Sequence, residues 1–203
     1  MRWVAAAVDA LSMRDSRLGS VLRSTARVAL TGLIVALSAA APASASQAAC
    51  PGADRATGDT RHAQKAILCL HNLERRQHGL SQLRWNRGLA RVAARHARDM
   101  VSRHYFEHVS PGGKDHMDRI AASGYKPAAG CWTAGENLFF STGRSTPRQL
   151  MNAWMNSPGH RENILRGGWD GFGLGVVSTS PQGDAKGLTV VALFGTRSTQ
   201  PCS

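Results

Sequence analysis

The sequence of 203 residues lacks several features that mark specialised classes of protein. It has no apolar run near 18 residues, which argues against a protein with several membrane-spanning helices. Its 21 glycines follow no three-residue period, which excludes collagen. It has neither the C-x-x-C pair of zinc ribbons and thioredoxins nor a G-x-S-x-G nucleophile elbow. It also has no alternating strand–helix pattern, so a doubly wound sheet is not expected.

Acidic residues are scarce: 13 Asp and Glu stand against 25 Lys and Arg, which gives a formal net charge of +12 at pH 7. A basic exported protein can adhere to anionic cell-wall polymer, lipid headgroups or nucleic acid. The basic residues are scattered along the chain rather than clustered in one run, and scattered arginine is more often a solvated surface. We therefore favour the solvated surface and expect no specific nucleic-acid partner.

Residues 1–45 have the pattern of a secretory signal peptide. Five arginines and two acids precede an apolar run from Val28 to Ala41, and Ala43 and Ala45 then form an A-x-A cleavage site. The run of 14 residues would span about 21 Å as a helix, which is short for a bilayer. We expect cleavage near Ala45, a secreted protein and a flexible lead-in over residues 46–59. An uncleaved signal anchor is the alternative.

Four cysteines follow the expected cleavage site, at positions 50, 69, 131 and 202. An even number of cysteines in an exported chain indicates disulfides, and four cysteines allow three pairings. The spacing does not decide among them. We expect Cys50–Cys202, tying the termini together, and Cys69–Cys131, tying the first helix to the middle of the domain.

Hydrophobic periodicity places helices first and strands last in the domain expected over residues 60–203, which indicates an α+β fold. The expected helices cover 60–78, 87–103, 115–123 and 147–156, and the expected strands cover 136–140, 172–179 and 188–194. A Ser-Pro-Gln-Gly turn separates the last two strands, so they should form a hairpin. The residues Ser157-Pro158-Gly159 are expected to break the fourth helix.

Three polar segments lie where turns meet helices or strands, which is where functional side chains are usually presented. They are Phe106–Gly113, Gly135–Leu138 and Trp154–Leu165. Together they supply two imidazoles and a carboxylate that could converge on a divalent cation. Because 28 residues separate His108 from Glu136 and 24 more precede His160, spacing alone does not show that these side chains meet.

In this order the segments resemble the CAP superfamily, which contains the cysteine-rich secretory, antigen 5 and pathogenesis-related one proteins. The likeness is strongest to its bacterial exported branch and covers roughly residues 60–196. It also includes Leu70-His71-Asn72-Leu73-Glu74-Arg75, Leu83–Asn86, His96–Met100, Gly173–Val176 and Phe194-Gly195. No single motif decides the assignment, but the ordered set is specific. The resemblance implies a three-layer α–β–α sandwich with a central antiparallel sheet.

The resemblance also implies a broad cleft lined by two histidines and two acids. By position the histidines are His108 and His160 and one acid is Glu136, while Ser157 stands where eukaryotic relatives carry the second acid. Gly112 likewise stands where relatives often carry Asp. A Zn²⁺ or Mg²⁺ ion would have at most the two imidazoles, Glu136 and water. We therefore expect weak binding that is lost when the histidines are protonated.

Each site residue also has a purely structural interpretation. His108 and His160 could hydrogen-bond loops, and Glu136 could pair with Arg75 or cap a turn. Four further residues are expected to hold loops by their side chains: Asn72, Arg75, Asn137 and Asn163.

Two catalytic patterns in the sequence are discounted. The H-x-x-E-H pattern at 104–108 lacks the helix that a zinc peptidase needs. Ser157 and His160 lie three residues apart, but Pro158-Gly159 intervene and no nucleophile elbow is present.

Three functions are left open, because a shared scaffold does not transfer function. We favour a monomeric secreted binding module that engages an extracellular or cell-envelope ligand in the His108/Glu136/His160 cleft. An exported hydrolase of peptide or cell-wall polymer, with Glu136 as general base, is the first alternative. A lipid or sterol carrier is the second, suggested by an apolar set that core packing explains at least as well: Trp132, Leu138, Phe139 and Phe140.

Overall fold

The computed structural model of the protein describes residues 50–200. The expected signal peptide, its cleavage site near Ala45 and Cys202 lie outside the described residues. No helix in the described part of the chain is both long enough and apolar enough to cross a membrane.

The described residues form helices and a four-stranded sheet. The helices are α2 (Thr60–Gln77), α3 (Arg87–Ser102), α4 (His116–Ala121), α5 (Pro147–Met155) and α6 (Pro158–Leu165). The strands are β1 (Arg84–Trp85), β2 (Cys131–Ser141), β3 (Gly171–Val177) and β4 (Leu188–Ser198). The strand order is β1-β3-β4-β2, so β1 and β2 lie at opposite edges of the sheet.

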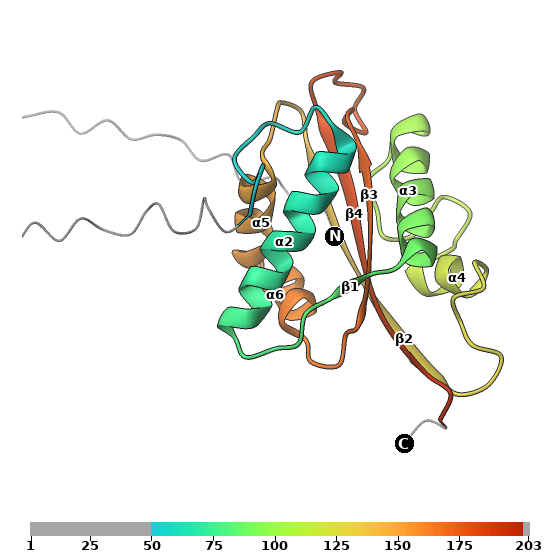
Figure 1. Cartoon of the computed structure of the whole chain (residues 1–203). Helices are drawn as coiled ribbons and strands as arrows, with labels where there is room; N and C mark the ends of the chain where they lie inside the picture. Colours follow the sequence, from blue (N-terminus) through green and yellow to red (C-terminus); the bar gives the residue numbers. More distant parts are fainter. Residues whose placement is uncertain (1–49, 201–203) are drawn as a thin grey trace, which may run out of the picture. The chain divides into compact units, whose positions relative to one another are not determined.

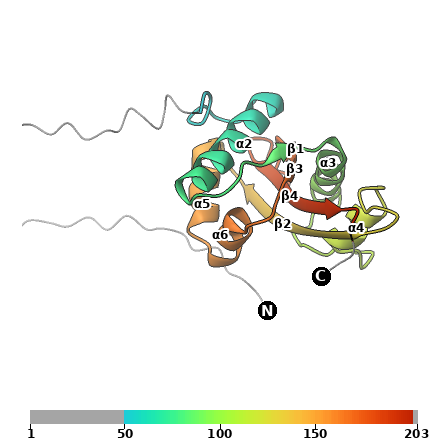
Figure 2. The ribbon, with the colours of Figure 1, turned by 60° about the horizontal axis from the view of Figure 1, so that its bottom comes forward.

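The sheet is the middle layer of a three-layer sandwich. Helices α2, α5 and α6 cover one face, and α3 and α4 cover the other, as Figures 1 and 2 show. Strand β4 pairs antiparallel with both β2 and β3, and the expected hairpin of β3 and β4 is confirmed. The short strand β1 pairs in parallel with β3, so the sheet is mixed rather than wholly antiparallel.

Strand β4 explains how one sheet separates two hydrophobic cores. Successive side chains of a strand point to opposite faces. Accordingly, Val190, Ala192 and Phe194 pack in the core under α2, α5 and α6, whereas Val191 and Leu193 pack in the core under α3 and α4. The central position of β4 therefore requires the continuous apolar run of its sequence.

Local signals account for where the elements begin. Helix α2 begins one residue after Asp59, whose carboxylate accepts the backbone N–H groups of Arg61 and His62 and so caps the helix. Helix α5 ends at Met155, so the expected break before residue 157 is present. Pro158 then starts α6, a helix that was not expected; proline is favoured in the first turn of a helix. Strand β2 starts at Cys131, five residues earlier than expected.

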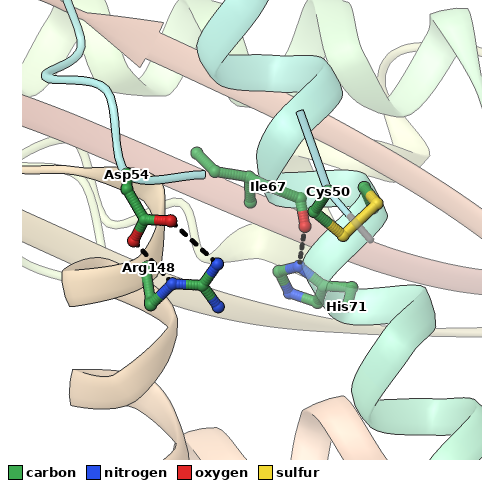
Figure 3. The surroundings of a disulfide bond; sticks show 6 residues. Cys50, Asp54, Ile67, His71 and Arg148 are labelled. Carbon is green, nitrogen blue, oxygen red and sulfur yellow. Dashed lines mark hydrogen bonds and ion pairs between the residues drawn. A yellow bond between two sulfur atoms is a disulfide. The ribbon is translucent and has the colours of Figure 1, made fainter. Parts of the chain in front are cut away.

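The structure corrects the expected disulfide pairing. Cys50 is bonded to Cys69, across a sequence separation of 19 residues, so both expected bridges, Cys50–Cys202 and Cys69–Cys131, are wrong. Cys131 is itself disulfide-bonded. The physical reason is that Cys50 packs in the core under α2, where its Cα lies 5.6 Å from that of Cys69, within the reach of a disulfide (Figure 3).

The segment 50–59 is held against the domain, in contrast to the flexible lead-in expected there. Cys50 and Ala53 are each 1% exposed and belong to the core under α2. Asp54 receives two hydrogen bonds from Arg148 on α5, at 2.6 and 3.0 Å (Figure 3). The disulfide and this ion pair fasten the segment to two different helices.

Candidate functional site

Glu136 lies in the middle of β2 and carries the centre of the site. Its side chain is only 1% exposed and, because it alternates with Ala134 and Leu138, it points to the face covered by α3 and α4. A buried carboxylate needs a partner of opposite charge. That partner is Arg119 on α4, whose Nη2 lies 3.1 Å from Oε1 and 2.8 Å from Oε2. The pairing of Glu136 with Arg75 that we considered is therefore not formed.

Arg119 also shapes the loop that carries His108. Its Nη2 donates to the carbonyl oxygen of His108 at 3.0 Å, and its Nη1 donates to the carbonyl of Lys114 at 2.7 Å and to Ser110 Oγ at 3.2 Å. One guanidinium thus joins the buried carboxylate to the loop over residues 108–114. The side chain can do this because a guanidinium has several donors in a fixed planar fork.

His108 is the exposed member of the cluster. Its Nδ1 lies 2.9 Å from Glu136 Oε1, and its side chain is 52% exposed. Burial raises the pKa of Glu136, but the hydrogen bond with His108 and the charge of Arg119 outweigh this, so the pKa falls below its ordinary value. The carboxylate is therefore ionised at neutral pH and accepts the proton of Nδ1. This contact fixes the ring and leaves Nε2 as its free nitrogen.

His160, near the start of α6, approaches β2 from the other face of the sheet. Its ring centroid lies 6.4 Å from that of Trp154, and its carbonyl accepts a hydrogen bond from Asn137 Nδ2 at 3.0 Å. Its buried Nδ1 has no hydrogen-bond partner among the described residues. Burial, and then the charge of His108, lower the pKa of His160, so the ring is neutral at pH 7. In the part of the chain that the structure describes, no hydrogen bond or ring contact joins His160 to His108.

The asparagines lie behind the site and connect its elements. Asn163 Nδ2 donates to the carbonyl of Glu136 at 3.2 Å and to Asn137 Oδ1 at 2.9 Å. Its own carbonyl accepts from the indole of Trp169 at 2.9 Å. A Cβ at Gly135 would lie 2.9 Å from Asn163 Oδ1, so the glycine makes room for this amide beside β2. These contacts hold α6, and with it His160, against the strand that carries Glu136.

Asn72 and Arg75 on α2 support loops that lie outside the cluster. The Asn72 side chain exchanges two hydrogen bonds with the backbone of Leu83, at 3.1 and 2.7 Å. Arg75 is buried and donates to three carbonyl groups, those of Ser81, Ile164 and Arg166. Both residues therefore support the backbone that precedes β1, and Arg75 also supports the end of α6.

Sequence reasoning missed one residue that contacts Glu136, which is Arg119. Arg119 lies on α4, a helix of six residues that begins with a capping box of Asp115 and Asp118. The capping box is visible in the sequence and indicates the helix, but nothing in it indicates that the arginine faces Glu136. His96 is buried on α3 with Nε2 3.1 Å from the carbonyl of Glu107, close enough to Glu136 to feel its charge.

The residues fit a metal ion only in part. Among residues 50–200, no three side chains of His, Cys, Asp or Glu lie close enough together to hold one. Both oxygens of Glu136 are taken by Arg119 and His108, so this carboxylate is not available as a ligand. The two imidazoles remain, which is fewer than the three protein ligands of a typical catalytic zinc site.

The two discounted catalytic patterns lack a catalytic arrangement. Helix α3 ends at Ser102, so His104 and His108 share no helical face, and His104 Nδ1 lies 3.0 Å from the carbonyl of Pro181. Ser157 is the residue that precedes α6, and the described structure gives its side chain no capping hydrogen bond. Neither pattern has the geometry of a peptidase or of a serine nucleophile.

A protein-family model named the cysteine-rich secretory protein family, CAP, matches residues 68–194. The chain belongs to the CAP family. The match covers α3 to α6 and the whole of the His108, Glu136 and His160 cluster. The sandwich of the CAP domain agrees with this assignment, as does the ordered set of motifs in the sequence.

Two Bacillus subtilis proteins resemble the CAP domain in sequence. The uncharacterized protein YkwD is 36% identical over 118 residues, and the uncharacterized membrane protein YlbC is 34% identical over 113 residues. These alignments cover 57% and 56% of this chain, but only 43% and 31% of the relatives. The chain therefore spans less than half of the length of either relative.

Two solved bacterial structures share the fold. An outer surface protein of Borrelia burgdorferi has a TM-score of 0.59 at 23% identity, covering 69% of this chain and 96% of that one. An extracellular protein of Bacillus anthracis that contains an SCP domain has a TM-score of 0.53 at 27% identity, covering 67% of this chain and 43% of that one.

Proposed function

We propose that this CAP domain is an extracellular binding module of the cell envelope, and that it engages its ligand through His108 and His160 beside β2. The proposed location rests on the signal-peptide pattern of residues 1–45 and on the Bacillus anthracis relative, which is described as extracellular. The observation that carries the proposed site is the ring of His108. Glu136 fixes that ring through Nδ1, while half of the side chain stays open to a ligand.

Binding accounts for the cluster better than hydrolysis does. A general base must reach the proton that it removes. Glu136, the base in the hydrolytic alternative, is 1% exposed, has both oxygens occupied and has a lowered pKa. The position expected for a second acid is Ser157, which cannot serve as an acid–base partner. The contacts of Glu136 instead orient His108, which suits recognition of a polar group by Nε2.

The lipid-carrier alternative loses its motivation. The Leu138 side chain is buried in the core under α3 and α4, the ring of Phe139 lies 6.5 Å from that of Trp154, and the ring of Phe140 lies 4.7 Å from that of Phe106. These apolar side chains therefore pack against the protein itself. A divalent metal stays in the proposal only with a smaller set of ligands, which are the two imidazoles and water.

Co-sedimentation with isolated bacterial cell-wall sacculi tests the proposal. The sacculi are first stripped of protein and of acid-labile anionic polymers, so that only the peptidoglycan is offered. We expect wild-type protein to sediment with them, and His108→Ala and His160→Ala to remain in the supernatant. His78→Ala, which removes an exposed imidazole at the end of α2, is the matched control and should sediment like the wild type.

Two results would overturn the proposal. Equal sedimentation of all four proteins would show that the histidines do not form the binding site. Release of soluble muropeptides by the wild type, at a rate abolished in His108→Ala, would show that the domain is a hydrolase.

A further inference from the structure

A basic groove runs between α2 and α3, along the β1 edge of the sheet. Figure 1 shows β1 between these two helices, and the strand order places this edge opposite to β2 and the histidines. Two adjoining hollows that share Gln64 and Trp85 form the groove. Six cationic residues line it: Arg61, Lys65, Arg87, Arg91, Arg95 and Arg98. No acidic residue lines either hollow.

Helical spacing gathers these cations from positions that look scattered in the sequence. Arg87, Arg91, Arg95 and Arg98 follow one another at intervals of four, four and three residues along α3, so they share one face of the helix. That row extends about 16 Å at the rise of an α-helix. Arg61 and Lys65 form a second row on α2.

The floor of the groove is the incompletely covered edge of β3. Strand β1 pairs with β3 only at Gly171 and Phe172. Farther along, the side chain of Gln64 reaches down and donates to the carbonyl of Leu174 at 3.0 Å. Trp85 lies where the two hollows meet, and it is 41% exposed, one of two large apolar side chains described as exposed. The groove thus has an open indole ring and two cationic walls, and its lining between them is largely apolar apart from Gln64.

The charge of the groove is not neutralised within the domain. Among the described residues, none of the six cationic side chains makes an ion pair or a side-chain hydrogen bond. Like charges four residues apart on a helix repel one another and destabilise the helix. Asp99, the single acid of α3, accepts a hydrogen bond from Tyr105 and lies near Arg103, outside the groove. An anionic occupant would relieve this repulsion.

We propose that the groove binds a strand of anionic polysaccharide, with Arg and Lys pairing its acidic groups and Trp85 stacking on a sugar ring. This site is distinct from the histidine cluster, and its choice of a polysaccharide rests on the extracellular location proposed above. A concave groove between two helices fits a single polymer chain, whereas the flat surface of a bilayer cannot reach its floor. Single-stranded nucleic acid is usually held by several aromatic rings that stack successive bases, and this groove offers one.

Affinity measurements with soluble probes test the proposal. The main probe is polygalacturonate, which has carboxylates on sugar rings. Dextran has sugar rings without charge, and polyphosphate has charge without rings. Single-stranded DNA and vesicles with an anionic phospholipid represent the two other classes of anionic ligand. We expect polygalacturonate to bind the wild type most tightly, with an affinity that falls as salt is raised, and dextran not to bind.

Charge reversal identifies the surface that is responsible. Arg91→Glu combined with Arg95→Glu should weaken polygalacturonate binding by at least about tenfold, because two attractive contacts become repulsive. The matched control combines Lys126→Glu with Arg144→Glu, two exposed cations outside the groove, and changes the net charge equally. The control should bind like the wild type. If both double variants bind polygalacturonate equally weakly, the effect comes from net charge alone and the groove is not the binding site.

Trp85 identifies the class of ligand. Trp85→Ala should weaken binding of polygalacturonate but leave the weaker binding of polyphosphate unchanged, and Trp85→Tyr should restore most of the affinity. Tighter binding of DNA or vesicles than of polygalacturonate would overturn the polysaccharide assignment. His108→Ala should leave polygalacturonate binding unchanged, so failure of the histidine site and failure of the groove are distinguishable.

Discussion

Arg119 on α4 and Glu136 on β2 form a buried ion pair that joins a short helix to the edge strand of the sheet. The two contacts from Nη2 are 3.1 and 2.8 Å long, and the two side chains are 12% and 1% exposed. The same arginine holds the backbone of the His108 loop. The position of the loop that carries His108 therefore depends on Arg119, whose side chain is itself largely buried.

Removal of Arg119 should destabilise the domain strongly. In Arg119→Met the carboxylate of Glu136 stays buried with only His108 as partner, and leaving a buried charge unpaired costs roughly 3–5 kcal/mol. Urea unfolding gives the free energy of unfolding. The control Arg103→Met removes a half-exposed arginine 3.8 Å from Asp99 and should cost less than about 1 kcal/mol. Similar losses of unfolding free energy in the two variants would show that the buried ion pair does not stabilise the domain more than the exposed one.

His71 should make the stability of the domain depend on pH. It is fully buried among Trp154, Phe172 and Phe194, and its Nδ1 lies 2.8 Å from the carbonyl of Ile67 (Figure 3). Burial lowers the pKa of His71 to about 4. Because the unfolded chain has the ordinary, higher pKa, it binds the proton more readily than the folded chain. The stability that the neutral ring contributes is therefore present above pH 6.5 and is lost as the pH falls towards 4.

Replacement of the ring tests this dependence. Between pH 6.5 and pH 4 we expect His71→Phe to lose less unfolding free energy than the wild type, by up to about 3 kcal/mol, since a depression of the pKa from 6.5 to about 4 corresponds to that amount. Urea unfolding at several pH values measures the difference. His78→Ala, at an exposed site, should keep the slope of the wild type. A wild-type slope in His71→Phe would refute the assignment.

Gly175 lets α3 pack directly against β3. A Cβ at this position would lie 2.4 Å from the carbonyl carbon and oxygen of Ala93. The backbone of the helix cannot yield as a flexible side chain could, so Gly175→Ala should cost at least about 2 kcal/mol through overpacking. Gly143→Ala, where nothing lies within 4 Å, is the control and should change the melting temperature little. Thermal unfolding of both variants measures the difference, and equal melting temperatures would contradict the tight packing.

Calorimetry with Zn²⁺ decides whether the imidazole pair holds a metal. We expect weak binding to the wild type at pH 7.5 that vanishes in His108→Ala and in His160→Ala and persists in His78→Ala. It should also weaken as the pH falls, because a protonated imidazole cannot be a ligand. Identical heats for the wild type and His108→Ala would remove the metal from the proposal.

Much of the fold was readable from the sequence because its signals are local. The apolar spacing in 87–103 predicts α3 to within one residue, and Pro147 marks the start of α5. Helix α6 was missed because Pro158 can both end one helix and begin the next. The start of β2 at Cys131 was missed because its first residues gain their strand conformation by pairing with Ser198 and Arg197 of β4.

The sequence by itself determined the family and the α+β layers, because these depend on residue types in a fixed order. Only the tertiary structure decided that Cys50 bonds to Cys69, that Arg119 neutralises Glu136, and that six cations line one groove. Each of these depends on which distant residues the packed chain brings together. A charge or a thiol acts on its neighbours in space, over a few ångströms, and separation along the chain does not specify those neighbours.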